Sequence, residues 1–157
     1  MSASSAGGGA EPEQGPEPNL PPIDSIVYDD ERPDEPTLSP GVERSDEFTV
    51  EGALVTDVGG TIGVTVLSTP GMIVMMERCS SVLSYAHLPR GRATVGFEVC
   101  VKHVAAAAEG ATCTVRSVLR EVVEGRKLHF DVEVTEGERT IGVGTHQRRV
   151  IDVGQLG

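Results

Sequence analysis

The chain has 157 residues and a formal net charge of −11, and a length of this order suits one domain. Residues 1–47 hold twelve acidic and two basic residues, so the rest of the chain is nearly neutral. That domain lacks the basic footprint that nucleic-acid binding requires. No apolar run approaches the roughly 20 residues needed to span a bilayer. We therefore expect neither nucleic acid nor a membrane as a partner.

The first 46 residues differ in composition from the rest of the chain. They hold eight of the ten prolines, and their acidic residues far outnumber their two basic ones. Such a segment has too little apolar surface to offset the entropy of ordering. We therefore predict a disordered tail over residues 1–46, acting as a tether, and a folded domain over residues 47–157.

The cysteines and histidines do not form a recognisable ligand pattern. Cys79, Cys100 and Cys113 are widely spaced on apolar faces, which is typical of reduced core residues in a cytosolic protein. No zinc-type spacing of Cys and His occurs, so we expect no metal and no cofactor. The N-terminus lacks a basic region followed by an apolar run. We expect a cytoplasmic protein.

Two short extended segments are predicted at residues 47–52 and 61–67, and a helix follows. Thr69 is a good N-cap and Pro70 suits the first helical position. The helix should end near His87, before Pro89 and Gly91. Apolar residues recur at helical spacing and predict one buried face, with Glu77, Ser80, Ser81, Ser84 and Tyr85 opposite: Met72, Met75, Met76, Cys79, Val82, Leu83 and Ala86.

Beyond the helix the apolar residues alternate with period two, which is typical of strands. Residues 93–101 should present Val95, Phe97 and Val99 on one face, and residues 127–134 alternate most clearly. Turn signals at residues 109–110, 124–125 and 136–137 predict an antiparallel meander. One helix on one antiparallel sheet is an α+β architecture. Its open edges favour pairing with a second copy.

Four blocks in this order carry a family resemblance. They are the run from Thr69 to Glu77, Val95-Gly96 with His103 seven residues after the glycine, residues 123–128, and residues 142–148. Over residues 48–152 the chain resembles the hotdog-fold thioesterases that include fluoroacetyl-CoA thioesterase. The resemblance implies one long central helix wrapped by a curved antiparallel sheet, assembled as a homodimer, with a tetramer as the alternative.

The resemblance also implies an active site. Thr69, Glu77 and His103 would be catalytic, the backbone N–H of Gly96 would bind the thioester carbonyl, and Arg148 would position the substrate or an active-site partner. A carboxylate can attack a thioester or activate water, and an imidazole can manage the proton. Whether Glu77 is the nucleophile or the base stays open.

Each of these residues also has a structural explanation. Glu77 is compatible with a solvated helix carboxylate, Thr69 with a plain N-cap, His103 with a structural histidine, Gly96 with a bulge, and Arg148 with an exposed charge for which Arg149 is an alternative. His146 lies in phase with Gly144 and Arg148, where we expect a supporting role at most.

We therefore predict an acyl-CoA thioesterase that releases a carboxylic acid and free CoA, with CoA as part of the substrate. The alternative is a non-catalytic hotdog module that binds an acyl-CoA or acts as an interaction scaffold. An enoyl-CoA hydratase is less favoured because no suitable Asp/His pair is present. No aromatic-rich insertion precedes Thr69, so we expect a more open pocket and no fluoroacetyl selectivity.

Overall fold

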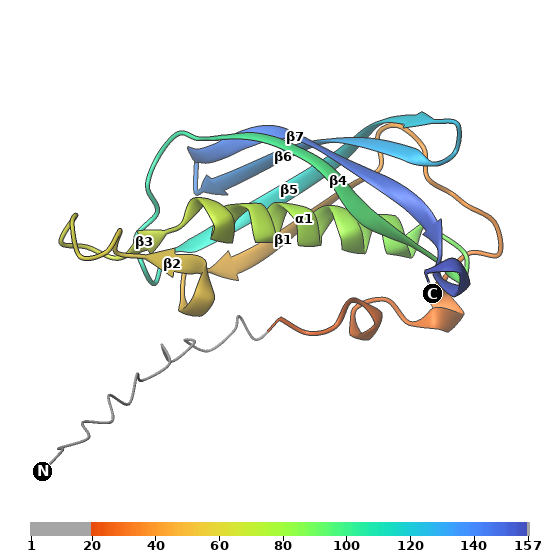
Figure 1. The fold of residues 1–157 in the computed structure, drawn as a ribbon, viewed down its shortest axis with the longest axis horizontal. Helices are drawn as coiled ribbons and strands as arrows, with labels where there is room; N and C mark the ends of the chain where they lie inside the picture. Colours follow the sequence, from red (N-terminus) through yellow and green to blue (C-terminus); the bar gives the residue numbers. More distant parts are fainter. Residues whose placement is uncertain (1–19, 157) are drawn as a thin grey trace, which may run out of the picture.

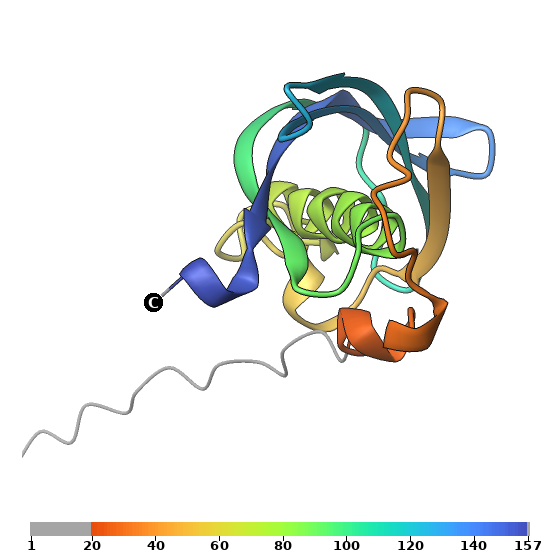
Figure 2. The ribbon, with the colours of Figure 1, turned by 90° about the vertical axis from the view of Figure 1, so that its right-hand side faces the viewer.

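The computed structural model describes residues 20–156. One helix, α1 (Thr69–Ala86), lies inside a curved five-stranded antiparallel sheet (Figure 1). The strands of this sheet, in spatial order, are β1 (Glu43–Thr49), β5 (Thr112–Val123), β6 (Lys127–Glu136), β7 (Arg139–Asp152) and β4 (Arg92–His103). Seen end-on, the sheet curls around the helix (Figure 2). The predicted α+β architecture is confirmed.

Apolar residues of the helix and of alternate strand positions fill the core between α1 and the sheet. On β6, Leu128, Phe130, Val132 and Val134 are buried, and their neighbours are half-buried, as the period-two pattern predicts. Met72, Met75, Met76 and Cys79 supply the helix side of the same cluster. The core therefore fixes which face of the sheet meets α1.

Ser80 and Ser84 differ from the prediction, because both are fully buried rather than on a polar face. The hydroxyls of Ser80 and Ser117 lie 2.7 Å apart, and Ser84 donates to the Ser80 carbonyl at 2.7 Å. A buried hydroxyl with a partner avoids the cost of desolvation. Small serines thus let the helix and β5 approach closely.

The strand order corrects one part of the predicted meander. β5, β6 and β7 are joined by tight turns. Three residues separate the paired Val123 and Lys127, and Glu124 and Gly125 among them adopt positive φ, at 55° and 64°. β4, however, pairs with β7 and not with β5. The turn at residues 109–110 therefore ends a crossover, and β4 becomes an edge strand.

A β-bulge between Gly96 and Glu98 interrupts β4. The predicted single apolar face of this strand is consequently wrong: Val95 and Phe97 are exposed, while Val99 and Val101 are half-buried. The same change of phase leaves Cys100 exposed, so only Cys79 and Cys113 are buried cysteines as predicted. One extra residue reverses which side chains face the core.

The chain before the helix is also more structured than predicted. β1 begins at Glu43, four residues before the expected domain boundary. Of the second extended segment only β3 (Val66–Leu67) forms a strand, and it pairs with β2 (Val55–Thr56). Four short 3-10 helices complete the described elements: η1 (Ile23–Ser25), η2 (Asp29–Glu31), η3 (Gly52–Leu54) and η4 (Val153–Gln155).

Residues 20–42 lie against the domain, where the sequence predicts a disordered tail. Leu20, Leu38 and Val42 pack on the core, and Val27 and Arg32 are each 8% exposed. These few apolar residues and one buried arginine give the segment contacts that its average composition conceals. The predicted disorder of residues 1–19 lies outside the described residues.

Candidate active site

Thr69 and His103 form one half of the candidate site. Ser68, not the predicted Thr69, caps α1, because the Ser68 hydroxyl accepts from the Gly71 N–H at 2.9 Å. The exposed Thr69 hydroxyl is thus released from capping and lies 2.9 Å from His103 Nδ1. His103 reaches it from the last residue of β4. The fold joins two predicted residues that are 34 positions apart.

The two ring nitrogens of His103 have different surroundings. Nδ1 meets the Thr69 hydroxyl, whereas Nε2 is buried and has no hydrogen-bond partner among residues 20–156. A buried nitrogen cannot exchange a proton with substrate or water. Nδ1 is therefore the ring nitrogen of His103 that is available for proton exchange, and the Thr69 hydroxyl is its hydrogen-bond partner.

Glu77 and Gly96 form the other half of the site. The half-buried Glu77 side chain leaves α1 toward β4, and a Cβ placed on Gly96 would lie 3.0 Å from Glu77 Oε1. Any larger residue at position 96 would press on this carboxylate. Gly96 precedes the bulge in β4, so its predicted alternative role as a bulge residue is compatible with a role at the site.

Arg148 on β7 completes this half of the candidate site. The side chain is 6% exposed and donates from Nε to Thr94 Oγ1 at 2.7 Å, from Nη2 to Ser81 Oγ at 3.3 Å and from Nη1 to His146 Nε2 at 3.1 Å. Burial lowers the pKa of Arg148, and the Glu77 carboxylate opposes this shift. The guanidinium therefore supplies a fixed positive charge beside Glu77.

His146, two residues before Arg148 on β7, contacts the guanidinium from the same face of the strand. Its Nδ1–H donates to the Glu98 carbonyl at 2.8 Å, which leaves Nε2 as the acceptor for Arg148. Burial is the main cause that lowers the pKa of His146, and the positive charge of Arg148 acts in the same direction. The neutral imidazole satisfies both contacts, so His146 orients the arginine.

One chain does not bring the three predicted catalytic residues into contact. Thr69 and Glu77 are eight residues apart on α1, which is about 12 Å along the helix axis. Gly96 and His103 are seven residues apart on β4, which is about 23 Å along a strand. The chain thus carries two half-sites: Thr69 with His103, and Glu77 with Gly96 and Arg148.

One of two cavities described below lies beside a half-site, and the other does not. A cavity of about 370 Å³ lies beside the Glu77 half-site, and Ser81 and Thr94 line it. A larger hollow of about 510 Å³ lies across β5, β6 and β7, and Arg120, His129 and Gln147 line it. The larger hollow contains none of the predicted catalytic residues, so we place the chemistry at the half-sites.

Residues 50–154 match the model of the fluoroacetyl-CoA-specific thioesterase family. The chain belongs to this family. It is 40% identical over 86 residues to a fluoroacetyl-CoA thioesterase of Streptantibioticus cattleyicolor, and this alignment covers 55% of the chain and 61% of the relative. The chain thus spans about three-fifths of the length of that curated relative.

Solved structures with a similar fold include a member of the same family. A structure of the fluoroacetyl-CoA thioesterase FlK is 30% identical with a TM-score of 0.67, covering 76% of this chain and 92% of that one. A hot-dog-like protein of Thermanaerovibrio acidaminovorans is 19% identical with a TM-score of 0.68, covering 83% and 91%. At that identity the likeness supports the fold alone, and the predicted hotdog fold is confirmed.

The family resemblance implies five candidate site residues but does not indicate which side chains support them. Ser81 and Thr94, which hold Arg148, were not expected at the site. The signal for His146 was its phase with Arg148 on β7, and burial of both side chains confirms that phase. The positions of Ser81 and Thr94 depend on how α1 packs against β4, which alternation along one strand does not encode.

Proposed function

We propose that this family member hydrolyses acyl-CoA thioesters, yielding a carboxylic acid and free CoA. The observation that carries the proposal is the Thr69–His103 contact at 2.9 Å in a chain that also holds a carboxylate against Gly96. A hydroxyl beside an imidazole, and a carboxylate beside a glycine backbone, are groups that acyl transfer uses.

The proposed reaction assigns one role to each half-site. Glu77 either attacks the thioester carbon or removes a proton from an attacking water. Gly96 has no side chain, so the substrate carbonyl can approach its backbone N–H. The C–S bond breaks, and the departing thiolate takes a proton that His103 Nδ1 supplies through or beside the Thr69 hydroxyl. If Glu77 attacks, water then hydrolyses the resulting anhydride and returns the free Glu77 carboxylate with the acid. If Glu77 acts as the base, water is already incorporated, and Glu77 passes the proton that it removed to solvent.

Two copies of the chain would complete the site. β4 is an edge strand whose Val95 and Phe97 side chains are 41% and 63% exposed. Such an edge favours antiparallel pairing with its own copy. In the register that we propose, the twofold axis passes between the two β4 strands at Cys100. Cys100 of one copy then lies opposite Cys100 of the other, with both side chains on the same face.

That pairing has a consequence for the site. The extra residue of the bulge at Phe97 then puts Gly96 opposite His103 of the second copy. Glu77 of one copy would meet Thr69 and His103 of the other. We therefore propose a homodimer with two shared sites. The cytoplasmic location remains a prediction; among residues 20–156 no helix is long and apolar enough to cross a bilayer.

Mixing two inactive variants tests the shared site. Glu77→Gln and Thr69→Val each disable both sites of their own homodimer. A mixed dimer regains one intact site, so equal mixing after reversible dissociation should restore roughly a quarter of wild-type activity. If each chain held a complete site, the mixture would stay inactive. Release of free thiol from acetyl-, butyryl- and hexanoyl-CoA provides the measurement.

Oxidation tests the register of the dimer. Directly opposite residues have Cβ atoms about 4.5–5.5 Å apart, which is near the range of a disulfide. Mild oxidation should therefore link two chains through Cys100, and Cys100→Ser should abolish the link. A dimer that resists cross-linking would show a different register, while a monomer would remove the shared site.

A non-catalytic role is the second candidate, and the separation of the half-sites in one chain favours it. A binding module would retain acyl-CoA without releasing thiol. Calorimetric binding of a non-hydrolysable acyl-CoA thioether, compared with turnover of the matching thioester, separates the two functions. Glu121→Gln, an exposed carboxylate outside both half-sites, is the control for Glu77→Gln. Equal thiol release by wild type and Glu77→Gln would remove Glu77 from the mechanism.

A further inference from the structure

Residues 20–32, here termed the N-terminal strap, lie outside the part of the chain that matches the family. The strap contains η1 and η2 and passes beside the C-terminal half of α1 (Figure 1). Val27 is its buried apolar contact. Any function of the strap is therefore a property of this chain and does not follow from the matched family region.

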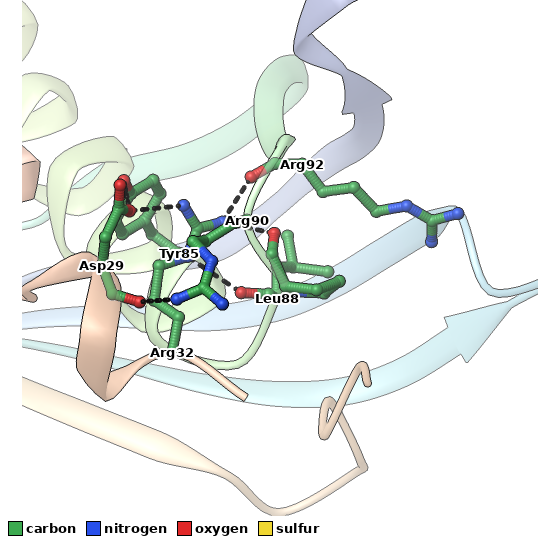
Figure 3. A network of polar contacts seen from close by, with 7 residues as sticks. Asp29, Arg32, Tyr85, Leu88, Arg90 and Arg92 are labelled. Carbon is green, nitrogen blue, oxygen red and sulfur yellow. Dashed lines mark hydrogen bonds and ion pairs between the residues drawn. The ribbon is translucent and has the colours of Figure 1, made fainter. Parts of the chain in front are cut away.

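Arg32 anchors the strap. Its side chain donates to the carbonyls of Leu88 at 2.9 Å, Pro89 at 2.7 Å and Arg92 at 2.6 Å (Figure 3). The guanidinium also lies 3.7 Å from the centre of the Tyr85 ring. These contacts join the strap to the end of α1 and to the start of β4, so its position is fixed from two sides.

The anchored strap forms one wall of the 370 Å³ cavity beside the Glu77 half-site. Ile23 and Asp24 come from the strap, Ser81 and Tyr85 from α1, and Ala93 and Thr94 from β4. Ser81 and Thr94 are also the residues that accept hydrogen bonds from Arg148. The cavity therefore borders the half-site, on the side away from Thr69 along the helix.

Charge indicates which end of an acyl-CoA this cavity receives. The strap holds four acidic residues and one basic residue. The nearby arginines lie outside the cavity lining: Arg78 donates to the Pro21 carbonyl, Arg90 donates to the Asp29 carbonyl, and Arg92 pairs with Asp152. Among the described residues that line the cavity, Asp24 alone is charged, and its carboxylate disfavours a CoA phosphate there, so the nucleotide end extends elsewhere. The acyl end of the acyl-CoA is therefore the part that would occupy the cavity.

We infer that the strap is the end wall of the acyl pocket, with Ile23 limiting the length of the acyl group and Asp24 disfavouring acyl groups that carry a carboxylate. The substrates selected would be uncharged acyl-CoAs. This inference rests on the proposed thioesterase function. It adds a specificity element that the matched region of the chain does not contain.

Changes in the size of residue 23 test the length limit. The readout is the ratio of kcat/KM for octanoyl-CoA to that for acetyl-CoA. Ile23→Trp should lower this ratio about tenfold and Ile23→Ala should raise it several-fold, as expected when pocket volume changes by more than a methylene. Ile26→Ala, in the same strap but outside the cavity lining, should leave the ratio unchanged. Circular dichroism and thermal unfolding verify that each variant folds.

A change of charge at residue 24 tests the preference for uncharged groups. Asp24→Asn should raise the ratio of kcat/KM for glutaryl-CoA to that for hexanoyl-CoA by about threefold, a modest factor because Asp24 is exposed and partly screened. Asp34→Asn, an exposed acidic residue outside the cavity, is the matched control. The effect should shrink at 0.5 M salt.

Failure of the inference and failure of the function are distinguishable. If wild type releases thiol and both Ile23 variants keep the wild-type chain-length ratio, the strap is not the acyl wall although the thioesterase function stands. If wild type releases no thiol from any ester in the panel, the proposed function is lost and the inference falls with it. If Ile23→Trp does not fold, Ile23→Ala and Asp24→Asn decide.

Discussion

Thr69 Oγ1 lies 2.9 Å from His103 Nδ1, and the residue before Thr69 performs the capping that would otherwise occupy this hydroxyl. Ser68 accepts from the Gly71 N–H and donates to the Leu54 carbonyl at 3.0 Å. Adjacent hydroxyls on α1 thus have separate tasks. One stabilises the start of the helix, and the other faces the imidazole.

Thr69→Val is expected to lower kcat by about a hundredfold, since positioned proton-transfer groups contribute at least that factor. Because Thr69 is not the cap, its free energy of unfolding should change by no more than about 0.5 kcal/mol. Steady-state thiol release and urea unfolding measure the two quantities on the same sample.

Ser68→Ala is the matched control for that change, and the opposite pattern is expected. Loss of the cap should cost about 1 kcal/mol of stability, while kcat stays within a few-fold of wild type. A Thr69→Val variant that is fully active but strongly destabilised would show that Thr69 is a structural residue.

Arg148→Lys is expected to lower kcat/KM roughly tenfold, because a lysine cannot serve Thr94, Ser81 and His146 at once. The loss of hydrogen bonds at a buried site should also cost about 2 kcal/mol in unfolding free energy. Arg149→Lys is the control. Its guanidinium lies 3.7 Å from the Phe97 ring centre, and a lysine retains that type of contact. Equal activity losses in both variants would contradict a special role for Arg148.

The sequence predicted the elements whose patterns are regular. The alternation on β6 and the helical spacing from Met72 onward both appear in the structure with the expected faces buried. These elements have one buried face and uninterrupted phase, so local pattern and tertiary packing agree. The hotdog architecture and the choice of the five candidate site residues came from the family resemblance and not from periodicity.

The features that sequence reasoning missed depend on contacts between distant segments. The bulge in β4 shifts phase by one residue without any local signal beyond Gly96. Ser80 is buried because it meets Ser117 on β5. Arg32 looks like an isolated charge in an acidic segment until the carbonyls after α1 are placed around it. In each case packing overrides the average preference of the segment.

His146 gives the site a defined pH response. Burial lowers its pKa below the ordinary value of 6.5, so the unfolded chain binds this proton more readily than the folded one. The stability that the neutral imidazole contributes is complete above about pH 6.5 and is lost as the pH falls toward the folded-state pKa. His146→Gln removes this titration, so the stability of wild type should fall more steeply than that of the variant between pH 7 and pH 5.

Urea midpoints at half-unit pH intervals measure that difference. If wild type and His146→Gln gave parallel curves over the whole range, the neutral state assigned to His146 in its contact with Arg148 would be wrong.

Arg32→Ala is expected to lower the free energy of unfolding by about 2 kcal/mol. The change removes a buried side chain and leaves the carbonyls of Leu88 and Pro89 without their donors. Arg90→Ala is the comparison, because Arg90 is exposed and makes a single hydrogen bond to the strap, at 3.2 Å. Its loss should cost less than about 0.5 kcal/mol.

Hydrogen exchange distinguishes a fixed strap from a loosely bound one. In wild type the Thr37 N–H, which donates to the His87 carbonyl at 2.9 Å, should be protected. Arg32→Ala should speed its exchange by at least tenfold, since opening of the strap would no longer break the carbonyl contacts. An unchanged exchange rate with unchanged stability would mean that the apolar contact at Val27, and not the buried guanidinium, holds the strap in place.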